Sequence, residues 1–281
     1  MSWHPDTIAS LTTVSVTSVV KRTDSMSRSV SPTCIPELSH SSWALRGATD
    51  SMLLMISLRS TYAFSSSDVT TDVVNEAIIL GCNLIVSHHP LLFHGLKQVC
   101  GQTPQARIVE MAIKHDIAIY SSHTSLDVAK DGINTRLAKK LDLHDCCFLT
   151  PNGLGVIGQL RQPMSYTDFI AYVRDVLEFT YVRYTRSAKE MVQIIALCGG
   201  SGAEFIGTAI ELGADVYLTA DCKYHEFQDA EGQIGLIDID HWISERHARE
   251  IFRDIIEPLG VKCIISKQDK TPIQLWQEQK N

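Results

Sequence analysis

Apolar and polar positions alternate with recognisable periods in the first half of the chain. Residues 70–80 carry apolar side chains at helical spacing, and Gly81 stands where a C-cap glycine is expected. The pattern then predicts a buried strand at 83–87, with further elements in this order: a helix at 105–114, a strand at 117–120 and a helix at 132–141. Such alternation is typical of a largely parallel sheet.

A second series of elements follows a glycine-rich break at residues 151–158. A helix is predicted at 166–177, and strands and helices then alternate: strands at 192–197, 216–218 and 236–239, and helices at 203–212, 224–230 and 243–256. The chain is therefore predicted to be an α/β protein of two lobes, 68–150 and 151–281, with mixed, largely parallel sheets.

Residues 1–67 do not share this pattern. Ser and Thr make up 25 of these 67 residues without a period, and residues 62–67 make a poor strand. A disordered segment and a shifted reading frame are the favoured interpretations. A targeting peptide is the alternative, against which the acidic residues nearly cancel the basic ones.

Composition excludes several functional classes. The chain has 25 Lys and Arg against 32 Asp and Glu, a net charge of −7, and no basic cluster, which argues against nucleic-acid binding. No apolar run approaches the roughly 20 residues that cross a bilayer, so we expect a soluble protein. Eight cysteines without CxxC pairs predict reduced thiols and a cytoplasmic location.

Candidate site residues lie directly after the predicted strands, where α/β sheets bind ligands. His88 and His89 follow the strand at 83–87. Adjacent histidines reach one site only where a strand is ending, and they would otherwise be hydrogen-bonded structural residues. His123 and Asp127 follow the next strand; Asp127 by itself is more typical of a helix or turn cap.

His241 and Glu245 are four residues apart, which places an imidazole and a carboxylate on one face of a helix. The alternative is a surface helix in which Glu245 pairs with Arg249. Residues 198–202 form a glycine-rich turn that either holds an anion or allows tight packing. His225, beyond the strand at 216–218, is a candidate acid or base, or a structural histidine.

Together these side chains offer more possible ligands than one zinc ion needs. Several imidazoles with a bridging carboxylate suit two divalent ions about 3.5–4 Å apart, which activate water at neutral pH.

The motifs resemble the Nif-three-like family, whose members bear the name GTP cyclohydrolase I type 2 homologue. The resemblance extends from about residue 68 to the C-terminus and rests on five segments: LIVSHHPLLF at 84–93, SHTSLDVA at 122–129, ALCGGSG at 196–202, ADVYLTAD at 214–221 followed by KYH, and DHWISER at 240–246.

The resemblance implies two related α/β lobes, a dinuclear metal site in the cleft between them, and a toroidal homohexamer. The residues that match the family's metal ligands are His88, His89, Asp127, His241 and Glu245, with Glu245 as the bridge. His123 and His225 match positions that line the same cavity, and proton transfer is their implied role. The metal, which could be zinc, iron, manganese, cobalt or nickel, is not specified by such a ligand set.

Two residues depart from the family pattern. Ala220 and Asp240 stand where glycine is usual. The methyl group of Ala220 is a small change, whereas Asp240 places a carboxylate beside a ligand and is expected to alter backbone geometry or charge.

The sequence thus predicts a dinuclear metal-dependent hydrolase that acts on a nucleotide or related small molecule. The alternatives are a non-catalytic metal-binding assembly or interaction protein, and an inactive product of a damaged gene. No membrane or nucleic-acid partner is expected.

Overall fold

The computed structural model describes residues 62–275, so most of the Ser/Thr-rich segment lies outside the described residues. Within that range the chain divides into two compact units. The first unit comprises 62–123 and 252–269, and the second comprises 124–251 and 270–275. Across residues 62–275, no helix combines the length and the apolar character that crossing a membrane requires.

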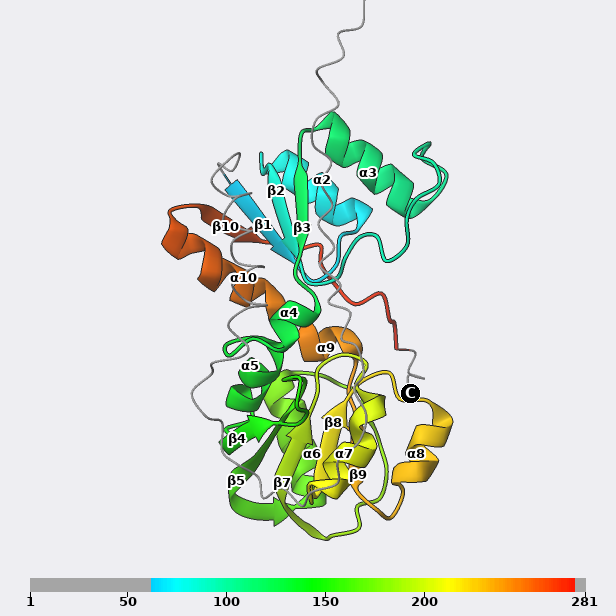
Figure 1. Cartoon of the computed structure of the whole chain (residues 1–281), viewed down its shortest axis with the longest axis vertical. Helices are drawn as coiled ribbons and strands as arrows, with labels where there is room; N and C mark the ends of the chain where they lie inside the picture. The colour runs from blue at the N-terminus through cyan, green and yellow to red at the C-terminus, as the bar shows by residue number, and fades with distance from the viewer. Residues whose placement is uncertain (1–61, 276–281) are drawn as a thin grey trace, which may run out of the picture. The chain divides into compact units, whose positions relative to one another are not determined.

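The first unit contains a four-stranded, all-parallel sheet of order β10-β1-β2-β3 (Figure 1). Its strands are β1 (Tyr62–Ser66), β2 (Leu84–Ser87), β3 (Ala118–Ser121) and β10 (Lys262–Ile265). Helices α2 (Thr71–Ile79) and α3 (Pro104–Lys114) connect successive strands. Each begins at a threonine whose hydroxyl accepts a backbone N–H of the first turn: Thr70 from Val73 and Thr103 from Ala106.

Strand β1 corrects the prediction that residues 62–67 make a poor strand. It pairs with β10 on one side and β2 on the other, and Phe64 is completely buried. Ser65, Ser66 and Ser67 are buried as well. The local pattern could not predict this strand, because its partner β10 comes from the far end of the described chain and the serines supply no apolar periodicity.

The second unit contains a six-stranded mixed sheet of order β4-β5-β7-β8-β9-β6. Its strands are β4 (His144–Phe148), β5 (Val156–Ser165), β6 (Arg183–Tyr184), β7 (Met191–Leu197), β8 (Val216–Thr219) and β9 (Gly235–Asp238). The central strands β7, β8 and β9 are parallel, whereas β4, β5 and β6 pair antiparallel. The predicted α/β class with mixed, largely parallel sheets is therefore confirmed.

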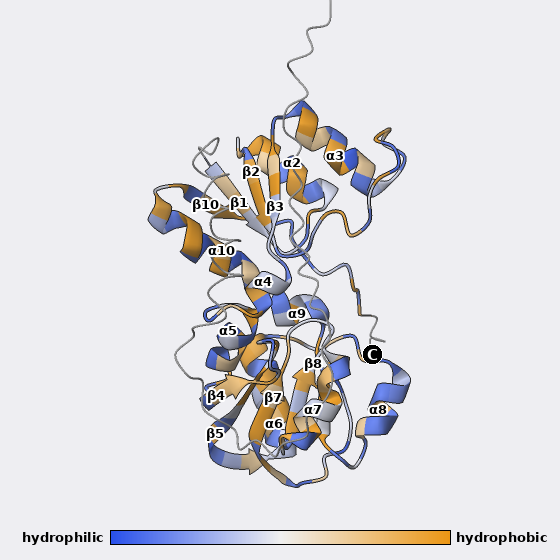
Figure 2. Ribbon diagram, viewed as in Figure 1, coloured by the Kyte–Doolittle hydropathy of each residue, from blue (hydrophilic) through white to orange (hydrophobic). Residues whose placement is uncertain are grey.

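Helices of the second unit cover both faces of this sheet. They are α4 (Thr124–Asp127), α5 (Ile133–Lys140), α6 (Tyr166–Leu177), the 3₁₀ turn Ala203–Phe205 with α7 (Ile206–Glu211), α8 (Tyr224–Ala230) and α9 (His241–Glu245). Successive strand residues face opposite sides: Ile195 and Leu197 pack with Phe169 of α6, whereas Ala196 packs with Ala209 of α7. Figure 2 shows β7 as largely hydrophobic and α8 as largely hydrophilic.

The observed elements differ from the predicted ones at several points. The predicted helix at 243–256 is divided into α9 and α10 (Ala248–Ile256). Strand β5 begins inside the predicted break at 151–158. The compact units are also not the sequential ranges 68–150 and 151–281: α4, α5 and β4 lie in the second unit, and β10 returns to the first.

Candidate metal centre

Three histidines converge at the carboxyl end of the first unit's sheet. His88 and His89 directly follow β2, and His123 follows β3, its parallel neighbour. One nitrogen from each ring lies within 4.8 Å of the others. The ring centroids are 4.8 Å apart for His88 and His89, and 5.0 and 5.4 Å from each of these to His123. The sheet thus brings together three of the predicted site residues.

The outer ring nitrogens of His88 and His89 are oriented by oxygen atoms. Nδ1 of His88 lies 3.1 Å from the carbonyl oxygen of Ser122, and Nδ1 of His89 lies 3.0 Å from Oδ1 of Asp68. A carbonyl oxygen only accepts, so Nδ1 of His88 is the donor, which leaves Nε2 as the nitrogen that can bind a ligand. Metal-binding histidines typically have this arrangement, with the second ring nitrogen donating to a carbonyl or carboxylate.

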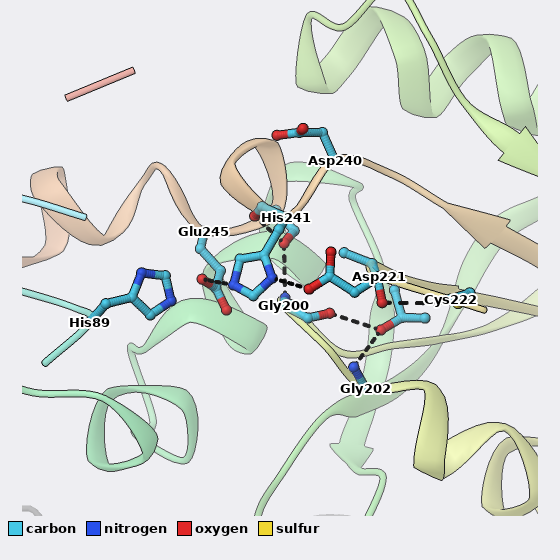
Figure 3. Close-up of polar contacts among 12 residues, drawn as sticks. His89, Gly200, Gly202, Asp221, Cys222, Asp240, His241 and Glu245 are labelled. Atoms are coloured by element: carbon cyan, nitrogen blue, oxygen red, sulfur yellow. Dashed lines mark hydrogen bonds and ion pairs between the residues drawn. The ribbon is translucent and has the colours of Figure 1, made fainter. Parts of the chain in front are cut away.

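A second cluster lies in the second unit around α9. Nε2 of His241 is 2.9 Å from Oε2 of Glu245, and Nδ1 is 2.7 Å from Oδ2 of Asp221. Figure 3 shows the His241 ring between these two carboxylates. Asp127, at the end of α4, has a carboxylate oxygen within 4.8 Å of one from Glu245. Glu245 is only 3% exposed, so the alternative of a surface helix is wrong.

The charged and buried groups of the second cluster shift one another's pKa values. Burial lowers the pKa of His241, but the hydrogen bonds and charges of Glu245 and Asp221 outweigh this effect and raise the pKa to about 9. Without metal, His241 is therefore an imidazolium at neutral pH. Burial, with smaller contributions from the charges of Asp127 and Glu245, raises the pKa of the Cys198 thiol to about 12. Without metal, Cys198 is therefore a thiol at neutral pH.

The glycine-rich turn at 198–202 packs tightly beneath Glu245. A side-chain carbon added at Gly200, whose φ is +66°, would lie 2.1 Å from Oε1 of Glu245. The N–H of Gly200 donates to the Ser244 hydroxyl, and that of Gly199 donates to Oδ1 of Asn134. These donors are used within the protein, so the tight-packing interpretation holds and the alternative of an anion-binding loop loses support.

Asp240 has a defined role at the start of α9. Its Oδ1 accepts the N–H of Ile243 at 3.2 Å, which makes it the N-cap of the helix that carries His241 and Glu245. Its φ is −58°, so the position does not require glycine. The departure from the family pattern therefore introduces a helix cap and leaves the backbone unstrained.

His225 is not part of either cluster. It lies exposed on α8, with Nδ1 3.0 Å from Oε1 of Gln228. Its proton-transfer role stays a prediction. Sequence reasoning instead missed Asp68 and Asp221 as partners of histidines. Both follow strands, β1 and β8, so the rule that selected the other candidates could have found them.

Comparison with known proteins identifies the family. The model of Duf34/NIF3 (NGG1p interacting factor 3) matches residues 58–272, and it therefore begins before the predicted onset at residue 68. This chain belongs to the Duf34/NIF3 family. The match includes β1 and β10, two of the strands that the sequence pattern did not predict.

Curated Duf34/NIF3 relatives are similar over most of their length. The GTP cyclohydrolase 1 type 2 homolog of Clostridium perfringens is 32% identical over 217 residues, 74% of this chain and 83% of the relative. That of Nostoc is 33% identical, covering 72% and 80% respectively. The crystal structure of Staphylococcus aureus hypothetical protein SA1388 has a TM-score of 0.71 at 28% identity, and covers 78% of this chain and 88% of that one.

The donor atoms of the two clusters fit divalent metal ions. They are imidazole nitrogens and carboxylate oxygens, which suit zinc, iron, manganese, cobalt and nickel. The oriented Nδ1 atoms of His88, His89 and His241 are an independent sign, because an oxygen acceptor behind each ring directs Nε2 toward a ligand. The described residues therefore include groups that could bind metal.

Proposed function

We propose that this Duf34/NIF3 chain is a hydrolase that depends on two divalent metal ions. Its proposed ligands are His88 and His89 of the first unit and Asp127, His241 and Glu245 of the second, with Glu245 as the bridge. The observation that supports this most is the position of Glu245, whose buried carboxylate lies beside both Asp127 and His241. The name of the curated relatives supports a cyclohydrolase-like reaction.

The proposed reaction needs an activated water molecule and a group that transfers protons. When bound, the two ions would polarise an electrophilic carbon or phosphorus and lower the pKa of a water molecule. His123 is the first candidate for moving a proton, because its ring lies in the histidine cluster. His225 is the second candidate. It is exposed on α8 and outside both clusters, so it could act only on a substrate that binds next to this helix.

We further propose a small-molecule substrate, with nucleotides as the first class to test, a homohexameric assembly and a cytoplasmic location. The relatives' name supports the first, and the resemblance in the motifs supports the second. The described cysteines, seven in number and all without disulfides, support the third. Light scattering on purified protein tests the assembly directly: a monomer at micromolar concentration would contradict it.

Elemental analysis tests the metal centre. We expect about two ions per wild-type chain and fewer than one for Glu245→Ala, because the proposed bridge would help to hold both ions. Glu211→Ala, an exposed glutamate at the end of α7, is the matched control and should retain both ions. Near-zero metal in folded wild-type protein, after purification without chelators and addition of each candidate metal, would refute the proposal.

Activity assays separate the enzyme from its alternative. A panel of nucleotides and phosphoesters with added metal should show turnover that His89→Ala abolishes. A non-catalytic metal-binding assembly would bind metal and assemble without turning over any member of the panel.

A further inference from the structure

The turn that follows β8 presents a carboxylate in an unusual backbone conformation. Asp221 has a φ of +58°, in the left-handed region that non-glycine residues seldom adopt. Its Oδ2 lies 2.7 Å from Nδ1 of His241, although the two residues are 20 positions apart. Its side chain is 52% exposed, so the contact adds little to folding stability by itself. An exposed carboxylate held in this conformation against a histidine 20 positions away suggests a functional role.

The residues on both sides of Asp221 are fixed by hydrogen bonds. The N–H of Ala220 donates to the carbonyl of Gly200 at 3.0 Å. The N–H of Cys222 donates to Oδ2 of Asp238 at 2.7 Å, and Asp238 is only 5% exposed.

Arg183, from the edge strand β6, strengthens the far side of this turn. Its guanidinium donates to the carbonyl of Cys222 at 3.0 Å and pairs with the carboxylate of Asp238. The turn is therefore anchored to β6, to β9 and to the glycine-rich turn, so the direction of the Asp221 carboxylate is set by several elements together.

We propose that Asp221 is a positioning residue for the metal centre. It holds the His241 ring so that Nδ1 donates to Oδ2 and Nε2 faces Glu245, the residue proposed to bridge the ions. Carboxylates behind metal-binding histidines fix the tautomer and the ring orientation in this way. The role rests on the proposed metal-dependent function and deepens it.

The same device occurs independently in the first unit. Asp68 follows β1 and lies 3.0 Å from Nδ1 of His89. Each unit thus places a carboxylate after one strand to orient a histidine supplied by another element. The recurrence favours a shared purpose over a chance contact.

Zinc affinity of the full chain, measured by competition with a chromophoric chelator, tests the role of Asp221. Asp221→Asn suits the left-handed conformation and keeps the side-chain volume, and we expect about 10-fold weaker binding of the ion at His241. Asp221→Gly removes the acceptor without straining the backbone, and about 100-fold weaker binding is expected. Asp229→Asn, at an exposed aspartate on α8, is the control and should bind as wild type does.

A spectroscopic readout separates positioning from a merely structural role. In zinc-loaded wild-type protein, ¹⁵N NMR should show His241 protonated at Nδ1 and coordinated through Nε2. Asp221→Gly should show a mixture of ring states with an unchanged backbone spectrum elsewhere. Should Asp221→Gly fail to fold, Asp221→Asn decides by the same two measurements.

The outcomes distinguish the two proposals. Equal zinc affinity and an identical His241 spectrum in wild type and both variants would overturn the positioning role and leave the metal centre standing. Failure of folded wild-type protein to bind any zinc, iron, manganese, cobalt or nickel would overturn the proposed function and the positioning role with it. Graded loss from wild type through Asn to Gly supports both.

Discussion

The first unit presents imidazoles, whereas the second presents carboxylates around one imidazole. His88 is completely buried against a backbone carbonyl, and the first unit's carboxylate beside these histidines, that of Asp68, is half-exposed and lies behind His89. In the second unit the buried Glu245 has His241 and Asp127 as neighbours. Burying a carboxylate is costly unless the charge is paired, whereas an imidazole need not carry a charge when it is buried.

This difference explains the different packing of the two clusters. The histidines lie on two loops that emerge from adjacent parallel strands, and they need only the sheet register to converge. Glu245 is held by its own helix, by the glycine-rich turn and by a protonated His241. The second cluster should therefore be more sensitive to changes in packing and pH than the first.

Of the substitutions that follow, Gly200→Ala should weaken zinc binding most. The added methyl would lie 2.1 Å from Oε1 of Glu245 at a φ of +66°, so the carboxylate must move and the backbone is strained. We expect about 100-fold weaker zinc binding, comparable with loss of an orienting partner. Gly207→Ala is the control, since its methyl meets nothing within 4 Å on α7, and its affinity should not change. Equal affinities for the two variants would show that Glu245 tolerates displacement.

His247→Gln should alter the pH dependence of stability. Burial lowers the pKa of His247 to about 4 from the ordinary 6.5, so the neutral ring favours the folded state above pH 6.5. As pH falls from 6.5 to 4, His247 binds a proton in the unfolded chain but stays neutral in the folded chain. The free energy of unfolding therefore decreases by about 3 kcal/mol. Glutamine retains a donor for the carbonyl of Ile133 without titrating.

The measurement is urea unfolding of metal-free protein at pH 7 and pH 4.5. Wild type should lose more stability than His247→Gln over this interval. Parallel losses in the two proteins would show that another group titrates in place of His247.

Asn134→Ala should weaken the support of the glycine-rich turn. Asn134 is 1% exposed, accepts the N–H of Gly199 at 2.8 Å and donates to the carbonyl of Asp127 at 3.1 Å. Loss of both bonds leaves buried backbone groups unsatisfied, and we expect a decrease of about 2 kcal/mol in the free energy of unfolding. Lys139→Ala, exposed on the same helix, should change it by less than about 0.5 kcal/mol. A similar value for both variants would argue against this buried link.

Asp68→Asn should give the smallest of the four effects. Its half-exposed carboxylate orients His89, but asparagine can still present an oxygen to Nδ1. Zinc binding should weaken by about 10-fold at the first unit's histidines. Asp72→Asn, in the first turn of α2, is the matched control and should bind zinc like wild type. A loss at Asp68 larger than that at Gly200 would reverse the proposed contrast between the units.

Much of the fold was predictable because its signals are local. The strand β2 and the helices α2 and α6 each carry an apolar period and a cap or glycine within a few residues of their ends. The helix predicted at 243–256 was too long because an amphipathic pattern continues across Arg246 and His247, where the chain separates α9 from α10.

Position after strands and helical spacing made the five proposed ligands candidates in the sequence, and the family resemblance then implied their role as ligands. The sequence could not show that Asp221 pairs with His241 or that Asn134 pairs with Gly199, because the members of each pair are at least 20 positions apart. Such pairs leave no periodic trace in the chain.

The sequence by itself determined the α/β class, the order of most elements and the chemical type of the candidate ligands, since these depend on side-chain period and identity. Only the tertiary structure decided that β1 lies between β10 and β2, that Glu245 is buried and that Asp221 orients His241. The physical reason is that pairing, burial and hydrogen bonding between distant segments are settled by the folded chain as a whole. A local pattern records only which face of a segment is apolar.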